Sequence, residues 1–190
     1  MSCTPEAIVS TAQRMAELGL VIGSFGNVSC RQQDRILITP TSLDYFQTEI
    51  RDLVTLDLAG EKLAGNREPS SEYRLHVAIY AARTDAKTIV HTHSTHALAL
   101  SLSASLRELP TLTEEMEVLV RGSVPIAHYV PAGTQELADR AAGILNGIPT
   151  KALILARHGV VGFGETLEEA LLVCRLVEKA AQIHLLAHPR

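Results

Sequence analysis

A short and wholly apolar segment, Ala152-Leu153-Ile154-Leu155-Ala156, constrains the fold more than any other part of the sequence. Such a segment is typical of a central strand that is covered on both faces. Segments of strand and helix character alternate along the rest of the chain. This interleaving predicts the α/β class, with a buried sheet between helical layers. The 190 residues are most simply one domain, residues 1–190.

The individual elements follow from periodicity and from capping residues. We expect strands over residues 35–39, 53–58, 86–90, 123–128 and 152–156, with a further short strand at Leu63. Hydroxyl caps at Thr4, Ser71, Thr134 and Thr166 predict helices over residues 5–19, 72–82 and 134–145 and from residue 167 onward. A further helix is expected to begin within residues 94–101. The glycine-containing segment 23–29 is expected to be a loop whose backbone N–H groups could face an anion.

Composition and charge limit the partners that such a chain can have. Hydrophobic residues make up 46% of the chain, charged residues 20%, and the formal net charge is −4. We therefore expect no nucleic-acid partner, because a nucleic-acid-binding protein usually carries a basic stripe. No apolar run is long enough to span a bilayer and no signal peptide is recognisable, so we expect no membrane partner and a cytoplasmic location. The scattered cysteines Cys3, Cys30 and Cys174 are expected to be reduced thiols.

The sequence Val90-His91-Thr92-His93 places two histidines one residue apart at the end of an apolar strand. Alternate residues of a strand face the same side, so the two imidazole rings can point toward one spot. Two converging neutral imidazoles are the beginning of a zinc or other transition-metal site. Taken alone, the pair is equally compatible with one ring that caps the strand and another that makes a local hydrogen bond.

His158 follows the apolar strand 152–156 and could add a third ligand, since binding sites in α/β sheets favour the crevice beyond strand ends. Three histidines and one open position are typical of a catalytic zinc site. Ser70 and Ser71 precede a helix, where N–H groups favour a phosphate, and Glu72 is close enough to reach a metal or to act as a general base. Each feature also has a plain interpretation: a His-Gly turn, helix caps, and an acidic first helical turn.

Five short motifs together carry a family resemblance, in this order and spacing: Gly26-Asn27-Val28-Ser29, Thr39-Pro40-Thr41-Ser42, Ser70-Ser71-Glu72-Tyr73-Arg74-Leu75-His76, His91-Thr92-His93-Ser94 and Arg157-His158-Gly159-Val160. They resemble the class II aldolase/adducin family, and in particular its L-fuculose-phosphate aldolase branch. The resemblance extends from about residue 5 to residue 185, which is nearly the whole chain.

The resemblance implies a three-layer α/β/α sandwich with a mixed central sheet, assembled as a homotetramer with active sites at subunit interfaces. It implies Zn²⁺, or another divalent transition metal, bound by Glu72, His91, His93 and His158. The substrate phosphate would be held by Gly26, Asn27, Thr41, Ser42, Ser70 and Ser71. The expected reaction is cleavage of a phosphorylated ketose to dihydroxyacetone phosphate and an aldehyde, in which the metal stabilises an enediolate and Glu72 moves the proton.

The chain also departs from that branch. Ser42 stands where these aldolases often have glycine, and the segment after Pro110 has no tyrosine acid but contains Thr113-Glu114-Glu115-Met116. Glu115 is similar to the acid/base of the methylthioribulose-phosphate dehydratases. Dehydration, 4-epimerisation of a pentulose phosphate and decarboxylation therefore stay open on the same metal site. A non-catalytic module that resembles the adducin head is the alternative from another class.

Overall fold

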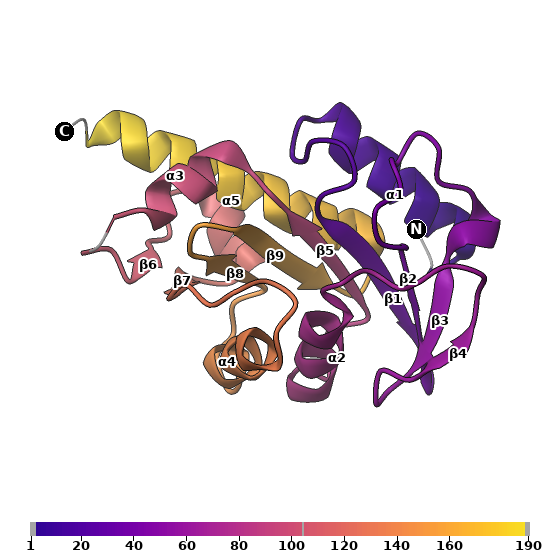
Figure 1. Cartoon of the computed structure of the whole chain (residues 1–190). Helices are drawn as coiled ribbons and strands as arrows, with labels where there is room; N and C mark the ends of the chain where they lie inside the picture. Colours follow the sequence, from indigo (N-terminus) through magenta and orange to yellow (C-terminus); the bar gives the residue numbers. More distant parts are fainter. Residues whose placement is uncertain (1–2, 104, 189–190) are drawn as a thin grey trace.

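The computed structural model describes residues 3–103 and 105–188, and these residues form one sheet between two helical layers (Figure 1). The described strands are β1 (Asn27–Gln32), β2 (Arg35–Ile38), β3 (Val54–Asp57), β4 (Lys62–Ala64), β5 (Thr88–Thr92), β6 (Glu108–Leu109), β7 (Val124–Ala127), β8 (Ala152–Leu155) and β9 (Gly159–Gly164). Their order in the sheet is β4-β3-β2-β1-β5-β9-β8-β7-β6. β7 and β8 run parallel and the other paired strands run antiparallel, so the sheet is mixed.

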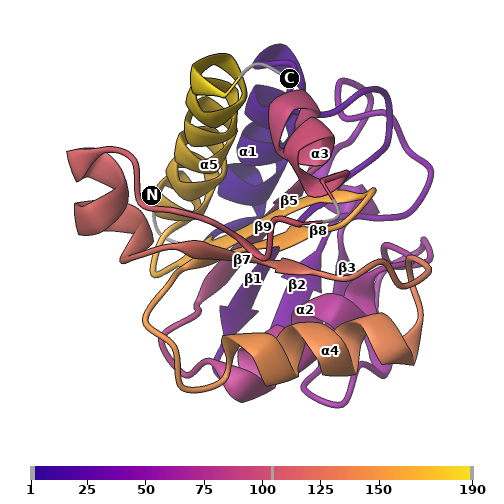
Figure 2. The same ribbon diagram turned by 90° about the vertical axis from the view of Figure 1, so that its left-hand side faces the viewer.

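Helices cover both faces of the sheet (Figure 2). On one face lie α1 (Pro5–Glu17), α3 (Thr95–Ser101) and α5 (Leu167–Ala187), and on the other lie α2 (Tyr73–Ala82) and α4 (Gln135–Leu145). A 3₁₀ turn spans Ile50–Asp52, and a π-helix spans Met116–Val120. The predicted three-layer α/β/α sandwich is therefore confirmed.

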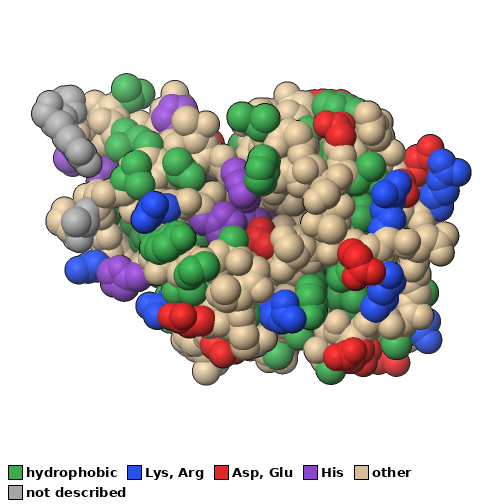
Figure 3. Space-filling model, in the orientation of Figure 1, with side chains coloured by type: hydrophobic (Ala, Val, Ile, Leu, Met, Phe, Trp, Pro, Cys, Tyr) green, Lys and Arg blue, Asp and Glu red, His purple; other side chains and the backbone are tan. Residues whose placement is uncertain are grey.

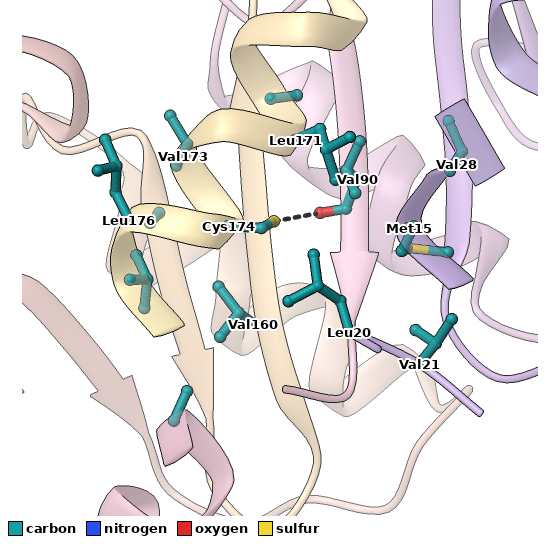
Figure 4. Packing of buried hydrophobic residues seen from close by; sticks show 14 of the residues in the cluster. Met15, Leu20, Val21, Val28, Val90, Val160, Leu171, Val173, Cys174 and Leu176 are labelled. Atoms are coloured by element: carbon teal, nitrogen blue, oxygen red, sulfur yellow. Dashed lines mark hydrogen bonds between the residues drawn. The ribbon is translucent and has the colours of Figure 1, made fainter. Parts of the chain in front are cut away.

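Alternate residues of the central strands feed two separate hydrophobic cores. Val90 of β5 and Val160 of β9 pack in the core beneath α1 and α5, whereas Ile89 and Val161 pack in the core beneath α2 and α4. Figure 4 shows the first core, where the Sγ of Cys174 donates a hydrogen bond of 3.3 Å to the carbonyl oxygen of Val90. Because side chains alternate along a strand, His91 shares the α2/α4 face with Ile89.

The elements largely lie where the sequence places them, with three corrections. Segment 23–29 is not entirely loop, because Asn27 already begins β1. Strands β1, β6 and β9 were not expected. The N-cap of α2 is Glu72 and not Ser71. The expected caps at Thr4, Thr134 and Thr166 are confirmed, since each hydroxyl accepts a hydrogen bond from a first-turn amide.

The cysteine expectation is wrong for two of the three residues. Cys3 and Cys30 are joined as a disulfide, with their Cα atoms 5.8 Å apart, whereas Cys174 is free and buried. The pairing follows from the fold, which brings the segment before α1 beside β1, and sequence spacing gives no sign of it. No helix in the described ranges is long and apolar enough to cross a membrane.

Candidate metal centre and adjoining cleft

Four side chains from three parts of the fold converge on one point. His91 lies in β5, His93 follows that strand, and His158 lies in the turn between β8 and β9. Glu72 at the start of α2 approaches from the helical layer, and the ligand atoms of the four residues all lie within 4.8 Å of one another. Figure 3 shows histidine side chains beside an acidic one at the centre of the molecular face, where the surface dips.

The nitrogen–nitrogen and nitrogen–oxygen distances fit a metal ion. The Nε2 atom of His91 lies 3.2 Å from the Nε2 atoms of both His93 and His158 and 3.2 Å from Oε2 of Glu72. Ligands at the zinc–nitrogen distance in a tetrahedron are separated by about 3.3 Å. The Nδ1–H of His91 donates to the carbonyl oxygen of Val160 at 2.9 Å, which leaves the lone pair of Nε2 directed at the centre.

The cluster contains buried atoms that the protein itself does not satisfy. Oε1 of Glu72 and Nδ1 of His158 are buried without a hydrogen-bond partner among the described residues, and Oε1 lies 3.1 Å from Nε2 of His158. A buried carboxylate oxygen without a donor is costly unless a cation neutralises it. Three neutral nitrogens and one carboxylate form a donor set suited to Zn²⁺ or a similar divalent metal. The four residues therefore fit the expected ion.

The charges of the cluster keep the carboxylate ionised. Burial would raise the pKa of Glu72, but the charges and hydrogen bonds of His91 and His158 outweigh burial and hold that pKa well below its usual range. Burial, and then the charges of His91 and His158, lower the pKa of His93 to about 3. Burial would lower the pKa of His91, but the charge and hydrogen bond of Glu72 raise it. A metal that binds to Nε2 of His91 would therefore displace a proton from the cluster.

Close backbone approaches fix the strands that carry the ligands. A Cβ atom at Gly159 would overlap the carbonyl oxygen of Thr92, so only glycine allows β9 to lie this close to β5 beside His158. Gly26 has a φ of +76°, and a Cβ atom there would lie 2.5 Å from the carbonyl oxygen of His91. On both sides of the cluster, the backbone can therefore follow its observed course only with glycine at these two positions.

All six residues expected at the phosphate line one cleft of about 140 Å³ that also reaches Glu72 and His93; they are Gly26, Asn27, Thr41, Ser42, Ser70 and Ser71. The hydroxyl of Tyr45 donates to the carbonyl oxygen of Gly26 at 2.5 Å and fixes the loop at one wall. Ser24, Phe25 and Pro40 complete the lining; they lie in the expected anion-facing loop and in the second family motif, but were not singled out as site residues. Larger hollows of about 550 and 770 Å³ lie elsewhere and contain none of the four ligands.

Ser42 adopts the left-handed conformation, with a φ of +57°. Glycine takes this conformation without cost, whereas other residues lose roughly 1–2 kcal/mol in it. This geometry gives a physical reason why the resembling aldolases often have glycine here.

Glu115 and two further histidines of the same chain lie apart from the cluster. Glu115 is exposed, and its Oε1 lies 3.2 Å from Nζ of Lys179. Nδ1 of His96 lies 2.7 Å from Oε1 of Glu178, on the other helical layer. Nε2 of His128 lies 3.3 Å from a guanidinium nitrogen of Arg107.

Comparisons with known proteins agree with this geometry. Residues 6–185 match the family described as Class II Aldolase and Adducin N-terminal domain. L-fuculose phosphate aldolase of Escherichia coli is 38% identical over 94% of this chain and 80% of its own length, and 5-deoxy-D-ribulose 1-phosphate aldolase of Bacillus thuringiensis is 36% identical over 94% and 83%. A solved L-fuculose 1-phosphate aldolase superposes with a TM-score of 0.86 at 31% identity, covering 96% of this chain and 85% of that one. The chain therefore belongs to the class II aldolase/adducin family and is similar to its L-fuculose-phosphate aldolase branch.

Proposed function

We propose that this protein is a zinc-dependent aldolase that cleaves a phosphorylated ketose, similar to L-fuculose 1-phosphate, into dihydroxyacetone phosphate and an aldehyde. The observation that carries the proposal is the junction of the Glu72, His91, His93 and His158 cluster with the polar cleft of Ser70 and Ser71. A divalent metal held by these four residues would supply Lewis acidity that stabilises negative charge on the substrate oxygens. The similarity to named sugar-phosphate aldolases supports the same substrate class.

The residues of this chain have separate tasks in that reaction. The cleft binds the phosphate through neutral donors of Asn27, Thr41, Ser70 and their neighbours, and so orients the ketose beside the cluster. The bond between C3 and C4 breaks, its electron pair stays with C3 and the adjoining carbonyl, and the C4 hydroxyl gives its proton to the ionised carboxylate of Glu72 and becomes the aldehyde. Glu72 then delivers a proton to C3, which completes dihydroxyacetone phosphate.

A dehydratase is the second candidate, and Glu115 is the observation that favours it. The segment Thr113-Glu114-Glu115-Met116 supplies a carboxylate where the resembling aldolases have a tyrosine. Glu115 is exposed, pairs with Lys179 and belongs to neither the cluster nor the cleft of its own chain, so it would act in the site of a neighbouring subunit. We therefore propose that the protein is a homotetramer with active sites at the subunit interfaces. We also propose that it works in the cytoplasm.

The test of the aldolase proposal combines metal analysis with a substrate panel. We expect one zinc per chain, and retro-aldol cleavage of L-fuculose 1-phosphate or 5-deoxyribulose 1-phosphate with products identified by NMR. Formation of a dehydrated sugar instead would favour the dehydratase. Absence of any metal would support a non-catalytic module.

Glu72→Gln tests the proposed role of the carboxylate directly. The variant keeps the shape of the side chain but cannot move a proton, so we expect activity to fall by about 10²–10⁴-fold while zinc is retained. Glu61→Gln is the control, because Glu61 is exposed and outside the cleft. Full activity of Glu72→Gln would overturn the assignment.

A further inference from the structure

A chain of buried polar side chains leads from the interior of the α2 layer to the metal cluster. The Oγ of Ser29 lies 2.7 Å from the hydroxyl of Tyr80 and 2.6 Å from Nδ1 of His76. Nε2 of His76 contacts Oδ1 of Asn27, and Nδ2 of Asn27 donates to Oε2 of Glu72 at 3.1 Å. His76 and Ser29 are fully buried, and the other three residues are at most 6% exposed.

The folding of two elements brings this polar chain together. Asn27 and Ser29 are alternate residues of β1 and pair with His91 and Ile89, so both face the α2 side of the sheet. His76 and Tyr80 are one helical turn apart on α2 and point down onto β1. The link from helix to strand therefore depends on the same register that places His91 in the cluster.

The chemistry of the end group determines the direction of every hydrogen bond. An ionised carboxylate only accepts, so Asn27 must turn its NH₂ toward Glu72 and its Oδ1 toward His76. Nε2 of His76 must then carry the proton. A neutral imidazole protonated at Nε2 accepts at Nδ1, so the hydroxyl of Ser29 donates to His76 and that of Tyr80 donates to Ser29. All four donors point toward Glu72.

The surroundings of His76 favour this neutral state. Burial, and then the charge of His91, lower the pKa of His76 to about 3, although Glu72 opposes the effect. Ser29 and Asn27, the side chains that form hydrogen bonds with His76, are both uncharged. A buried imidazole without a charged partner is neutral at physiological pH, and its tautomer is set by its neighbours.

We propose that His76 is a positioning residue of the metal centre: through Asn27 it holds the carboxylate of Glu72 in the orientation that binds the metal. The inference rests on the proposed role of Glu72 as a ligand and proton carrier. If the Nε2–H donor is lost, the amide of Asn27 is free to turn and present its oxygen to the carboxylate. Two acceptors would then face each other, and Glu72 would leave the cluster.

The tautomer itself is the first test, and it needs neither substrate nor enzyme activity. NMR of protein labelled with ¹⁵N-histidine identifies which ring nitrogen of His76 carries the proton, in both the metal-free and the zinc-loaded protein. We expect the Nε2–H tautomer in both states. An Nδ1–H tautomer or a doubly protonated ring would overturn the proposal, whatever the substrate of the enzyme proves to be.

Metal affinity is the second test, measured by competition with a chelator. Loss of a residue that orients a ligand typically costs 10–100-fold in affinity, and we expect that loss in His76→Leu. His76→Gln retains an N–H donor and should recover most of the affinity. Tyr80→Phe removes only the remote end of the polar chain and should change the affinity less than about threefold.

A double-mutant cycle separates positioning from a general packing effect. In the Glu72→Ala background, His76→Leu has no carboxylate to orient, so we expect almost no further loss of zinc affinity. An equal loss in both backgrounds would show that His76 merely supports the fold, and would refute the proposal. If His76→Leu does not fold, the ring tautomer of the unmodified protein still decides the question. Absence of aldolase activity would affect the proposed reaction only.

Discussion

Glu72 occupies the N-cap position of α2, yet its side chain accepts no hydrogen bond from the first turn of that helix. A capping side chain ordinarily contributes about 0.5–2 kcal/mol to helix stability. Here the carboxylate is directed toward the cluster, where Asn27 and the histidines hold it. At the scale of single residues, the side chain of Glu72 therefore contributes to the cluster and does not cap α2.

The depressed pKa of His76 predicts acid sensitivity of the metal-free protein. The ordinary value is 6.5 and the folded value is about 3. Between these values the unfolded chain binds a proton that the folded protein does not, so the free energy of unfolding falls as the pH falls through that window. Urea unfolding of metal-free protein across that range checks this. We expect His76→Leu to reduce the slope by up to ~1.4 kcal/mol per pH unit. An unchanged slope would mean that other groups control acid stability.

The strands and helices differ in how well they can be predicted from the sequence. Apolar segments such as Ala152–Leu155 were predictable because their period and composition reflect burial. β1 was not predicted, because Asn27 and Ser29 are polar and their hydrogen bonds to His76 of α2 cannot be recognised from local sequence. β9 was missed because Gly159, Gly162 and Gly164 resemble a turn. In the structure they are strand residues whose neighbours pack so closely that a Cβ atom would overlap them.

The candidate site shows the same division. The four residues of the cluster and the six cleft residues were predictable because local motifs carry them, and the structure brings the two groups together. The neighbours that orient them were not, because contacts such as that of Tyr45 with Gly26 join segments without a common pattern. The buried hydrogen bonds of His76 with Ser29 and Asn27 were likewise not predictable, because they depend on the register between β1 and α2.

The contact between β5 and β9 predicts a sharp difference between two glycines. Gly159→Ala places a methyl group against the backbone of Thr92, so we expect a loss of roughly 1–3 kcal/mol in stability and weaker metal binding through His158. Gly143→Ala is the matched control, because Gly143 lies in α4 with open space around its Cβ position, and it should gain up to about 1 kcal/mol. Urea denaturation and zinc titration measure both effects. Equal stability of the two variants would contradict the assigned contact.

At the scale of the whole molecule, one chain brings together the four-residue cluster and the polar cleft, but Glu115 belongs to neither of them. Glu115 lies immediately before the π-helix, and its charge is matched by Lys179 of α5 at 3.2 Å. Hydrogen bonds to its own backbone, to the Thr113 side chain and to Lys179 lower the pKa of this exposed carboxyl. A carboxylate so placed can serve the reaction only if assembly brings it to the cluster of another subunit.

Mixing two inactive variants tests that assembly. If Glu115 completes the site of its neighbour, Glu72→Gln and Glu115→Gln are each inactive as pure oligomers. Subunits that are dissociated, mixed in equal amounts and reassembled combine at random. A site is then intact when one subunit supplies Glu72 and its neighbour supplies Glu115, so about a quarter of the full activity should return.

The alternatives give different results in the same experiment. If Glu115 acted within its own chain, every site would still lack one of the two carboxylates and mixing would restore nothing. If Glu115 had no role, the pure Glu115→Gln oligomer would already be active and mixing would only dilute it. Equal mixing of Glu72→Gln with unmodified protein is the control, and it should give about half of the full activity, because each intact Glu72 then always has a neighbour with Glu115. Recovery near a quarter, against a half in the control, would thus establish both the shared site and the role of Glu115.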